Sequence, residues 1–239
     1  MIIEVDKLTF EYNRGTKILK NITFKVDKGQ IVGILGSNGS GKTTLINLLI
    51  GYLKTSGHIS VLDQKPDINN RDFKSIIGVV RDDDEVIEFL TLYEYLYFVG
   101  NAYNIERQVL EERIDKLLDI FQIKEHKNRI LKNFSHGMIK KAQIISAILH
   151  QPKLLIVDEP TNGLDIEMIA LLKNIFKNLK SEGTTLLIST HNIDFVRSIC
   201  DRVIIINSGE VSKVVDIKDK TNIDIEDIFL KSIGGNTNG

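Results

Sequence analysis

The sequence predicts an α/β fold with a parallel sheet, an antiparallel β part near the N-terminus and an α-helical insertion. Apolar runs followed by helical patterns recur from residue 31 onward, which is typical of a parallel sheet covered on both faces. Residues 2–10 and 22–26 instead contain β-like stretches, the second with strict apolar/polar alternation. Residues 83–150 show helical spacing and no strand pattern.

The first elements are strands over residues 2–10 and 22–26, and a turn signal at residues 27–29 closes the second strand. We expect these strands to form a small antiparallel sheet. Residues 31–35 then form an apolar strand, and a glycine-rich loop leads into a helix that ends at Gly51. A strand, a loop and a helix in this order begin the parallel core.

The insertion begins with a helix, because Thr91 and Glu94 have the spacing of a capping box. Helical spacing continues over residues 106–121, and Ser135 precedes a third helix. Aromatic side chains gather in the first part of the insertion, where they either form an apolar docking surface or pack the insertion's own core. They are Phe89, Tyr93, Tyr95, Tyr97 and Phe98.

Further strands of the parallel core are predicted at residues 76–80, 154–157, 185–189 and 203–206. We expect a single domain over residues 1–239. Its catalytic core with the antiparallel part comprises residues 1–82 and 151–215, its helical subdomain residues 83–150, and a C-terminal helix and tail residues 216–239.

The composition argues against several classes of protein. A formal net charge of -1 over 239 residues gives no general attraction to nucleic acid, so no nucleic-acid partner is expected. Apolar runs such as residues 154–157 are far shorter than the ~18 residues of a membrane-spanning helix, and residues 1–10 carry charges where a signal peptide is apolar. The single cysteine, Cys200, excludes an internal disulfide and is interpreted as a small buried side chain. These features predict a cytosolic chain unless a partner holds it at a membrane.

Residues 36–43 read GSNGSGKT and match the phosphate loop G-x-x-x-x-G-K-[ST] between a strand and a helix. The glycines let backbone N–H groups face the phosphates, and the helix N-terminus adds its positive dipole end. Lys42 can reach the β and γ oxygens, and Thr43 can ligate Mg²⁺. The loop therefore predicts binding of a purine nucleoside triphosphate. The predicted phosphate-binding residues are Gly36, Ser37, Asn38, Gly39, Ser40, Gly41, Lys42, Thr43 and Thr44.

A carboxylate pair, Asp158 and Glu159, ends the apolar strand at residues 154–157. Asp158 is predicted to hold Mg²⁺ through water, while Glu159, one residue further out, can polarise the attacking water as a general base. A solvated acidic turn is the alternative, and the phosphate loop in the same chain argues against it.

Five motifs in order resemble the nucleotide-binding subunits of ATP-binding cassette (ABC) proteins, over nearly the whole chain. They are GSNGSGKTT at residues 36–44, FSHGM at 134–138, LLIVDEP at 154–160, TNGLD at 161–165 and STH at 189–191. The resemblance implies a P-loop NTPase core and an ATPase whose cofactors are ATP and Mg²⁺.

The resemblance also implies an ATP-dependent dimer, either of two copies or with a homologous subunit. In such a head-to-tail dimer, Ser135 and Gly137 of one subunit close over the γ-phosphate held by the other. A helix N-terminus is an anion site, so this role is physically reasonable, and Ser135 can also be a simple N-cap. Asp165 resembles the loop carboxylate that couples the two sites.

Two further site residues follow from the resemblance. His191 matches the family's switch histidine, which hydrogen-bonds the γ-phosphate and orients the water beside Glu159. Tyr12 lies where the family carries an aromatic side chain that stacks on adenine, and its alternative is a half-exposed sheet tyrosine. His58, His126 and His150 have no such context, and neither they nor His136 receives a role.

The sequence departs from the family pattern at two places. Counting on from IGVV at residues 77–80 places Asp82 where most members have a glutamine that contacts Mg²⁺ and water. We predict that Asp82 takes that place as a metal ligand, and a solvated acidic loop remains the alternative. The second departure is His136, which stands where a glycine is usual; the variant resembles ATPases of drug, antibiotic and bacteriocin exporters.

The function predicted from these features is ATP hydrolysis that drives a separate membrane-spanning subunit, from the cytoplasmic face of the membrane. The alternative is a small accessory ATPase of a soluble complex. A binding-only module is disfavoured because Lys42, Asp158, Glu159 and His191 are all present.

Overall fold

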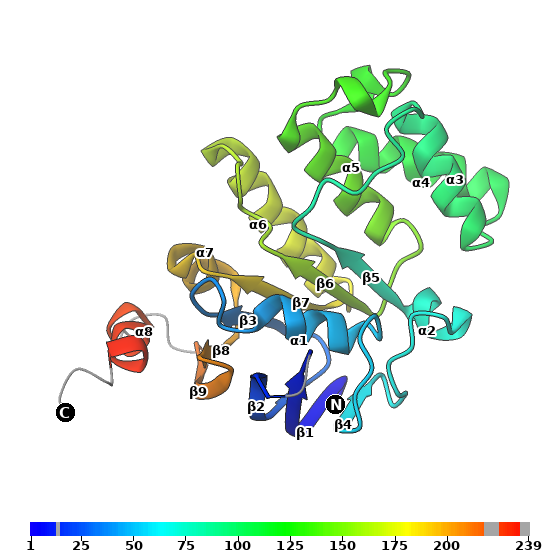
Figure 1. Cartoon of the computed structure of the whole chain (residues 1–239). Helices are drawn as coiled ribbons and strands as arrows, with labels where there is room; N and C mark the ends of the chain where they lie inside the picture. Colours follow the sequence, from blue (N-terminus) through cyan, green and yellow to red (C-terminus); the bar gives the residue numbers. More distant parts are fainter. Residues whose placement is uncertain (13–14, 218–224, 235–239) are drawn as a thin grey trace.

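The computed structural model of the chain describes residues 1–12, 15–217 and 225–234. Its centre is a six-stranded sheet in the order β5-β6-β7-β3-β8-β9 (Figure 1). All neighbours in it are parallel except β9, which pairs antiparallel with β8. The strands are β3 (Ile31–Leu35), β5 (Ile77–Val80), β6 (Leu154–Asp158), β7 (Thr185–Thr190), β8 (Arg202–Asn207) and β9 (Glu210–Asp216).

A second, antiparallel sheet lies at the N-terminal part of the chain, in the order β2-β1-β4. The predicted strands are present as β1 (Ile3–Glu11) and β2 (Lys17–Val26). The third strand, β4 (His58–Val61), pairs with β1 and was not predicted. With only four residues it carries too little alternation to be recognised in the sequence.

The parallel sheet is buried on both faces, as the apolar runs predict. Along β3, Ile31 and Leu35 enter one hydrophobic core while Val32 and Ile34 enter the other. This alternation follows from the two-residue repeat of a strand. The loops at the carboxyl ends of these strands therefore stand on a rigid base.

Helices and the second sheet cover these two faces. Side chains of α1 (Lys42–Leu49) and α2 (Arg71–Ile76) join the core that includes the antiparallel sheet. Side chains of α6 (Ile166–Ser181), α7 (Ile193–Ile199) and α8 (Ile225–Gly234) join the other core. Cys200 is buried there, as predicted, and burial raises the pKa of its thiol. The tail after Gly234 lies outside the described residues.

The helical insertion lies between β5 and β6 in the chain and stands above one end of the sheet (Figure 1). It contains α3 (Leu92–Ala102), α4 (Arg107–Ile120), two short 3-10 turns (Lys124–His126 and Leu131–Asn133) and α5 (His136–Ile148). Thr91 and Glu94 form the predicted capping box, and Ser135 caps α5 by accepting a hydrogen bond from Met138 N. Local cap chemistry thus fixes where α3 and α5 begin.

The aromatic side chains of the insertion divide between the two interpretations. Tyr95 is buried and its hydroxyl donates to Ser146 Oγ at 3.2 Å. Tyr93 and Tyr97 stack on each other with ring centroids 5.7 Å apart. In contrast, the side chains of Phe89 and Phe98 are 78% and 57% exposed.

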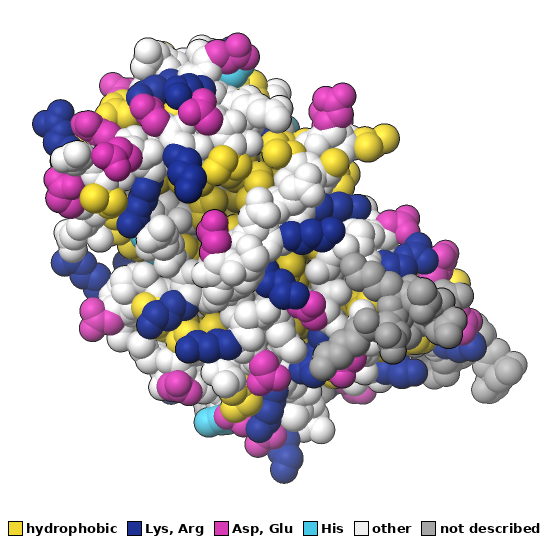
Figure 2. Space-filling model, turned by 180° about the vertical axis from the view of Figure 1, so that it is seen from behind, with side chains coloured by type: hydrophobic (Ala, Val, Ile, Leu, Met, Phe, Trp, Pro, Cys, Tyr) yellow, Lys and Arg dark blue, Asp and Glu magenta, His cyan; other side chains and the backbone are white. Residues whose placement is uncertain are grey.

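On the opposite side of the molecule, hydrophobic side chains gather in a hollow below the helical part (Figure 2). Leu117, Ile120, Ile175 and Leu179 line a cavity between α4 and α6. No helix within the described parts of the chain has the length and apolarity needed to span a bilayer.

Candidate active site

The phosphate loop connects β3 to α1, so it lies at the carboxyl end of one of the two central strands of the sheet. Gly41 has φ +104°, and a Cβ there would lie 2.7 Å from Leu19 Cδ2. Glycine is favoured at this position by the left-handed backbone, and a larger residue would also have to displace the Leu19 side chain. The N-terminus of α1 has no side-chain cap, which leaves its backbone N–H groups available for an anion.

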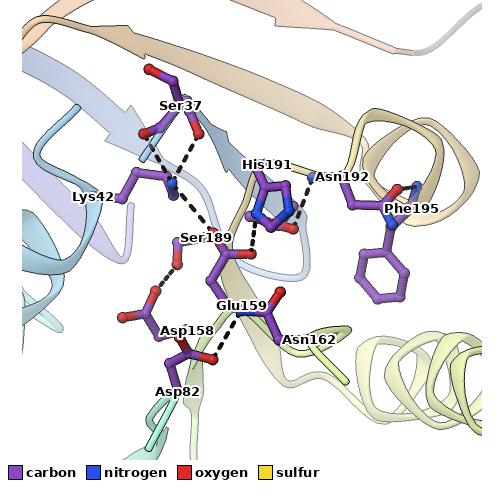
Figure 3. A network of polar contacts seen from close by, with 12 residues as sticks. Ser37, Lys42, Asp82, Asp158, Glu159, Asn162, Ser189, His191, Asn192 and Phe195 are labelled. Atoms are coloured by element: carbon purple, nitrogen blue, oxygen red, sulfur yellow. Dashed lines mark hydrogen bonds and ion pairs between the residues drawn. The ribbon is translucent and has the colours of Figure 1, made fainter. Parts of the chain in front are cut away.

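Lys42 points back over this loop (Figure 3). Its Nζ donates to the carbonyl oxygens of Gly36 at 2.8 Å and of Ser37 at 3.3 Å. It also lies 3.3 Å from Glu159 Oε1, and both side chains are buried. The lysine charge is thus fixed at the mouth of the loop, where phosphate oxygens approach.

Asp158 ends β6 beside the loop and is 4% exposed. Its carboxylate accepts a hydrogen bond from Thr43 Oγ1 at 3.1 Å and another from Ser189 Oγ. Burial raises the pKa of the Asp158 carboxyl, and the bonds from Ser189 and Thr43 oppose that effect. This arrangement keeps a costly buried carboxylate next to the phosphate loop.

The carboxylate of Glu159 lies between Lys42 and His191. Its Oε2 lies 3.1 Å from His191 Nδ1, on the other side from Lys42 (Figure 3). A carboxylate only accepts, so His191 Nδ1 carries the proton in this contact. Glu159 has φ +45°, an uncommon backbone conformation that directs the chain out of β6. His191 itself stands between β7 and α7, whose N-cap is Asn192.

Tyr12 approaches the site from the end of β1. Its ring is 55% exposed and packs edge-on against Phe10 with centroids 5.1 Å apart. Its hydroxyl lies 3.3 Å from Thr44 Oγ1. An exposed ring next to the first turn of α1 is available for stacking on a base.

The structure thus brings the phosphate loop, Asp158, Glu159 and His191 together, with Tyr12 at the edge. It places other predicted residues elsewhere. Ser135 and Gly137 lie at the start of α5 on the helical insertion, and among the described residues Ser135 makes no hydrogen bond to the phosphate loop but accepts from Met138 N. Asp165 caps α6 and accepts from Met168 N at 2.7 Å.

Asp82 lies beside the carboxylate pair but bonds to another residue. Its Oδ1 accepts from Asn162 Nδ2 at 3.1 Å (Figure 3). Its charge raises the pKa of Asp158 slightly, after the larger effect of burial. Neither Asn162 nor the contact of Ser189 with Asp158 was singled out from the sequence. A polar residue near the end of a buried strand is the sequence signal that could have indicated a role for Ser189.

The donor set fits Mg²⁺ bound together with a nucleotide. Within residues 1–12, 15–217 and 225–234, no group of three or more His, Cys, Asp or Glu is arranged to hold a metal ion. Protein-bound Mg²⁺ is usually held by one or two carboxylates, waters and substrate phosphates. The hydroxyl of Thr43 and the carboxylate of Asp158, already in contact, supply oxygens of that kind.

Comparison with known proteins identifies the family. The family model "ABC transporter" matches residues 19–162. The ABC transporter ATP-binding protein NatA of Bacillus subtilis is 34% identical over 197 residues, covering 82% of this chain and 80% of NatA. The uncharacterized ABC transporter ATP-binding protein YdbJ of the same organism is 38% identical over 207 residues, covering 85% of this chain and 66% of YdbJ. The energy-coupling factor transporter ATP-binding protein EcfA2 of Clostridium perfringens is 32% identical, covering 88% of this chain and 76% of EcfA2.

Solved structures agree. An ATP-binding subunit of an ABC transporter superposes with a TM-score of 0.89 at 28% identity, over 97% of this chain and 99% of that one. CbiO1 of Clostridium perfringens, part of the ABC transporter complex cbiONQ, gives 0.82 at 28% identity, over 96% and 94%. The dimeric bacterial ABC transporter cassette MJ0796 gives 0.82 at 25% identity, over 91% and 99%. The protein therefore belongs to the ABC transporter family and is an ATP-binding cassette ATPase with the α/β P-loop fold.

Proposed function

We propose that this chain hydrolyses ATP as the energy-supplying subunit of a transporter whose membrane-spanning part is a separate polypeptide. The observation that carries the proposal is Glu159, a buried carboxylate held between the phosphate-loop Lys42 and His191. Such a carboxylate next to a phosphate site can act as a general base on water.

Each residue of the site has a role in this proposal. Glu159 accepts a proton from the attacking water while the oxygen of that water bonds to the γ-phosphorus. The bond between the γ-phosphorus and the oxygen that bridges it to the β-phosphate breaks, which releases ADP. Lys42 and the loop N–H groups stabilise the charge on the phosphates. His191, held by Glu159, reaches the γ-phosphate with its other ring nitrogen. Tyr12 stacks on the adenine.

Thr43 and Asp158 would hold Mg²⁺, and Asp82 would contribute as a further ligand. The bound ion would neutralise charge on the phosphate oxygens. Both Thr43 and Asp158 lie in the described site with their oxygens already directed at one another.

We further propose an ATP-dependent head-to-tail dimer in which Ser135 and Gly137 contact the nucleotide of the partner. Their position on the helical insertion, away from the phosphate loop of the same chain, supports this assignment. Asp165, at the start of α6, would link the two sites. The dimeric MJ0796 cassette supplies a precedent at 25% identity.

Residues 83–150 would move as one subdomain and transmit closure to the membrane partner. A groove lined by Tyr52, Arg81, Asp83 and Glu85 opens beside the start of this subdomain, and Phe89 is exposed nearby in the chain. This proposal places the chain at the cytoplasmic face of the membrane, bound peripherally, with no nucleic-acid partner.

The direction we propose is export of a drug, antibiotic or peptide. The sequence FSHGM at residues 134–138 supports it, by its resemblance to exporter ATPases. The name of EcfA2 shows that an energy-coupling factor transporter subunit is also among the relatives, so transport itself must be measured.

The test is to pull down the tagged chain from solubilised native membranes and to identify its partners by mass. The proposal expects a polytopic membrane protein. When that pair is reconstituted in vesicles, ATP should drive the cargo across the membrane, away from the side that contains ATP. Glu159→Gln is the matched inactive control. A soluble complex without a membrane protein would support an accessory ATPase instead.

A further inference from the structure

The first three turns of α5 hold the acidic segment, residues 81–84, by side chains on one helix face. Lys140 Nζ donates to Arg81 O at 2.8 Å, and Gln143 Nε2 donates to Asp83 O at 2.5 Å. One turn before Lys140, His136 Nδ1 lies 3.0 Å from the Asp84 carboxylate. Residues spaced by four and three positions share a helix face, so α5 and the acidic segment are bound as one unit.

Of these three side chains, His136 also reaches the turn that follows Glu159. Its Nε2 lies 3.0 Å from Asn162 O, in the turn that follows Glu159. The side chain of Asn162 donates to Asp82 Oδ1 at 3.1 Å. Asp82, Asn162, His136 and Asp84 thus form a ring across three separate parts of the chain, made by these three contacts and closed by the backbone from Asp82 to Asp84.

The backbone around the ring is shaped to admit the imidazole. Gly163 has φ +67°, and a Cβ there would lie 2.9 Å from His136 Cδ2. A side chain at position 163 would displace the imidazole of His136 and would also strain the backbone. The turn after Glu159 and the histidine are therefore packed directly against each other.

Both ring nitrogens of His136 face groups that can only accept. Asn162 offers a carbonyl oxygen and Asp84 a carboxylate, so both nitrogens donate when the ring is a charged imidazolium. Asp84 raises the pKa of His136, whereas partial burial and the charge of Lys140 act against that. A cation at the first residue of a helix opposes the helix dipole, so the two acceptors must offset that cost.

We propose that His136 is a positioning residue for ATP hydrolysis, which links the N-terminus of α5 and the acidic segment to the turn that follows Glu159. Asn162 N lies 3.4 Å from Glu159 O in that turn, so the link ends close to the catalytic carboxylate. Through this link Asp82, Ser135 and the Glu159 turn hold a single relative arrangement. The inference rests on ATP hydrolysis and is independent of the cargo and of the membrane partner.

The test uses the purified full chain. His136→Ala, Asp84→Ala and the double variant are compared with wild type, with His58→Ala as the control because His58 is exposed on β4. Loss of a hydrogen bond to a charged group predicts a fall in kcat of about ten-fold or more for His136→Ala, with the KM for ATP within about two-fold. The double variant should be no worse than the poorer single variant. Hydrogen exchange at residues 160–165 should accelerate in the absence of nucleotide in His136→Ala and stay unchanged in the control.

Asp84→Asn separates this role from a general packing role. Asparagine can donate to the unprotonated Nδ1 while Nε2–H still donates to Asn162 O, so the ring of contacts survives with a neutral histidine. The wild-type ring is complete below the raised pKa of His136 and is lost as the pH rises through it. The activity of Asp84→Asn relative to wild type should therefore increase as the pH rises through the raised pKa of His136.

Two results would overturn the proposal. One is a His136→Ala chain with kcat and hydrogen exchange both within about two-fold of wild type, a change smaller than one lost hydrogen bond. The other is an Asp84→Asn chain as impaired as Asp84→Ala at every pH. If His136→Ala fails to fold, the Asp84 variants carry the same test, because each removes or replaces only the exposed partner of the ring.

Discussion

Lys42 and Glu159 form a buried ion pair, with Nζ 3.3 Å from Oε1 and both side chains at most 8% exposed. In the proposed mechanism, the carboxylate assigned to activate water thus partly neutralises the cation assigned to the phosphates. Phosphate oxygens of ATP are stronger competitors for Lys42, so nucleotide binding should turn Glu159 toward His191. In the proposed mechanism, nucleotide binding and activation of Glu159 as the base would be coupled through this pair.

Asp158→Asn should stabilise the free chain while it abolishes hydrolysis. Burial raises the pKa of Asp158, so its charged form at neutral pH costs folding free energy, and that cost disappears as the pH falls through the raised pKa. Asparagine is neutral at every pH and still accepts from Thr43. At pH 7 the melting temperature should stay or rise by up to about 4 °C, and the gain should shrink in acid. A clear loss of thermal stability at pH 7, compared with wild type by calorimetry, would contradict this account of the buried charge.

Tyr12→Ala should weaken ATP binding about ten-fold and leave the fold intact. The expected loss follows from base stacking, worth ~1–3 kcal/mol, and the ring is 55% exposed, so little packing is lost. Titration with a fluorescent ATP analogue gives the affinity, and Tyr12→Phe is the matched control that keeps the ring but loses the contact with Thr44. If Tyr12→Ala binds as tightly as Tyr12→Phe, stacking is not the role of this residue.

Asp82→Gln should raise the Mg²⁺ concentration needed for half-maximal turnover by about three-fold or more, because a carboxylate ligand becomes a neutral amide. Turnover at saturating Mg²⁺ should change as well, since the amide can donate to water. The control is Asp83→Asn, because Asp83 faces Arg81 at 3.5 Å. Should both the Mg²⁺ dependence and the turnover remain at wild-type values, Asp82 belongs to a solvated loop.

Local patterns carried most of the correct predictions. The phosphate loop, the capping box at Thr91 and the cap at Ser135 each depend on residues a few positions apart, so the sequence displays them directly. The apolar strands of the core were recognised for the same reason. The order of these strands in the sheet differs from their order in the chain, because the connections cross over between non-neighbouring strands. No single segment of the sequence predicts that order.

Two of the features that were missed depend on distant pairs. β4 is a strand because β1 lies beside it, and its four residues alone carry almost no signal. His136 received no role because its partners, Asp84 and Asn162, lie 52 and 26 positions away in the chain. A lone histidine gives no indication of such partners until the fold brings them together.

The most direct test of the account is the Glu159→Gln variant, because the catalytic assignment and the ATP-driven dimer both depend on this site. Turnover is measured together with molecular mass in solution, with Mg²⁺ and ATP present. The account predicts that hydrolysis is abolished while ATP still binds, and that the mass doubles from about 27 kDa because the ATP-bound dimer is trapped. A variant that hydrolyses ATP at the wild-type rate, or that stays monomeric with ATP bound, would contradict it.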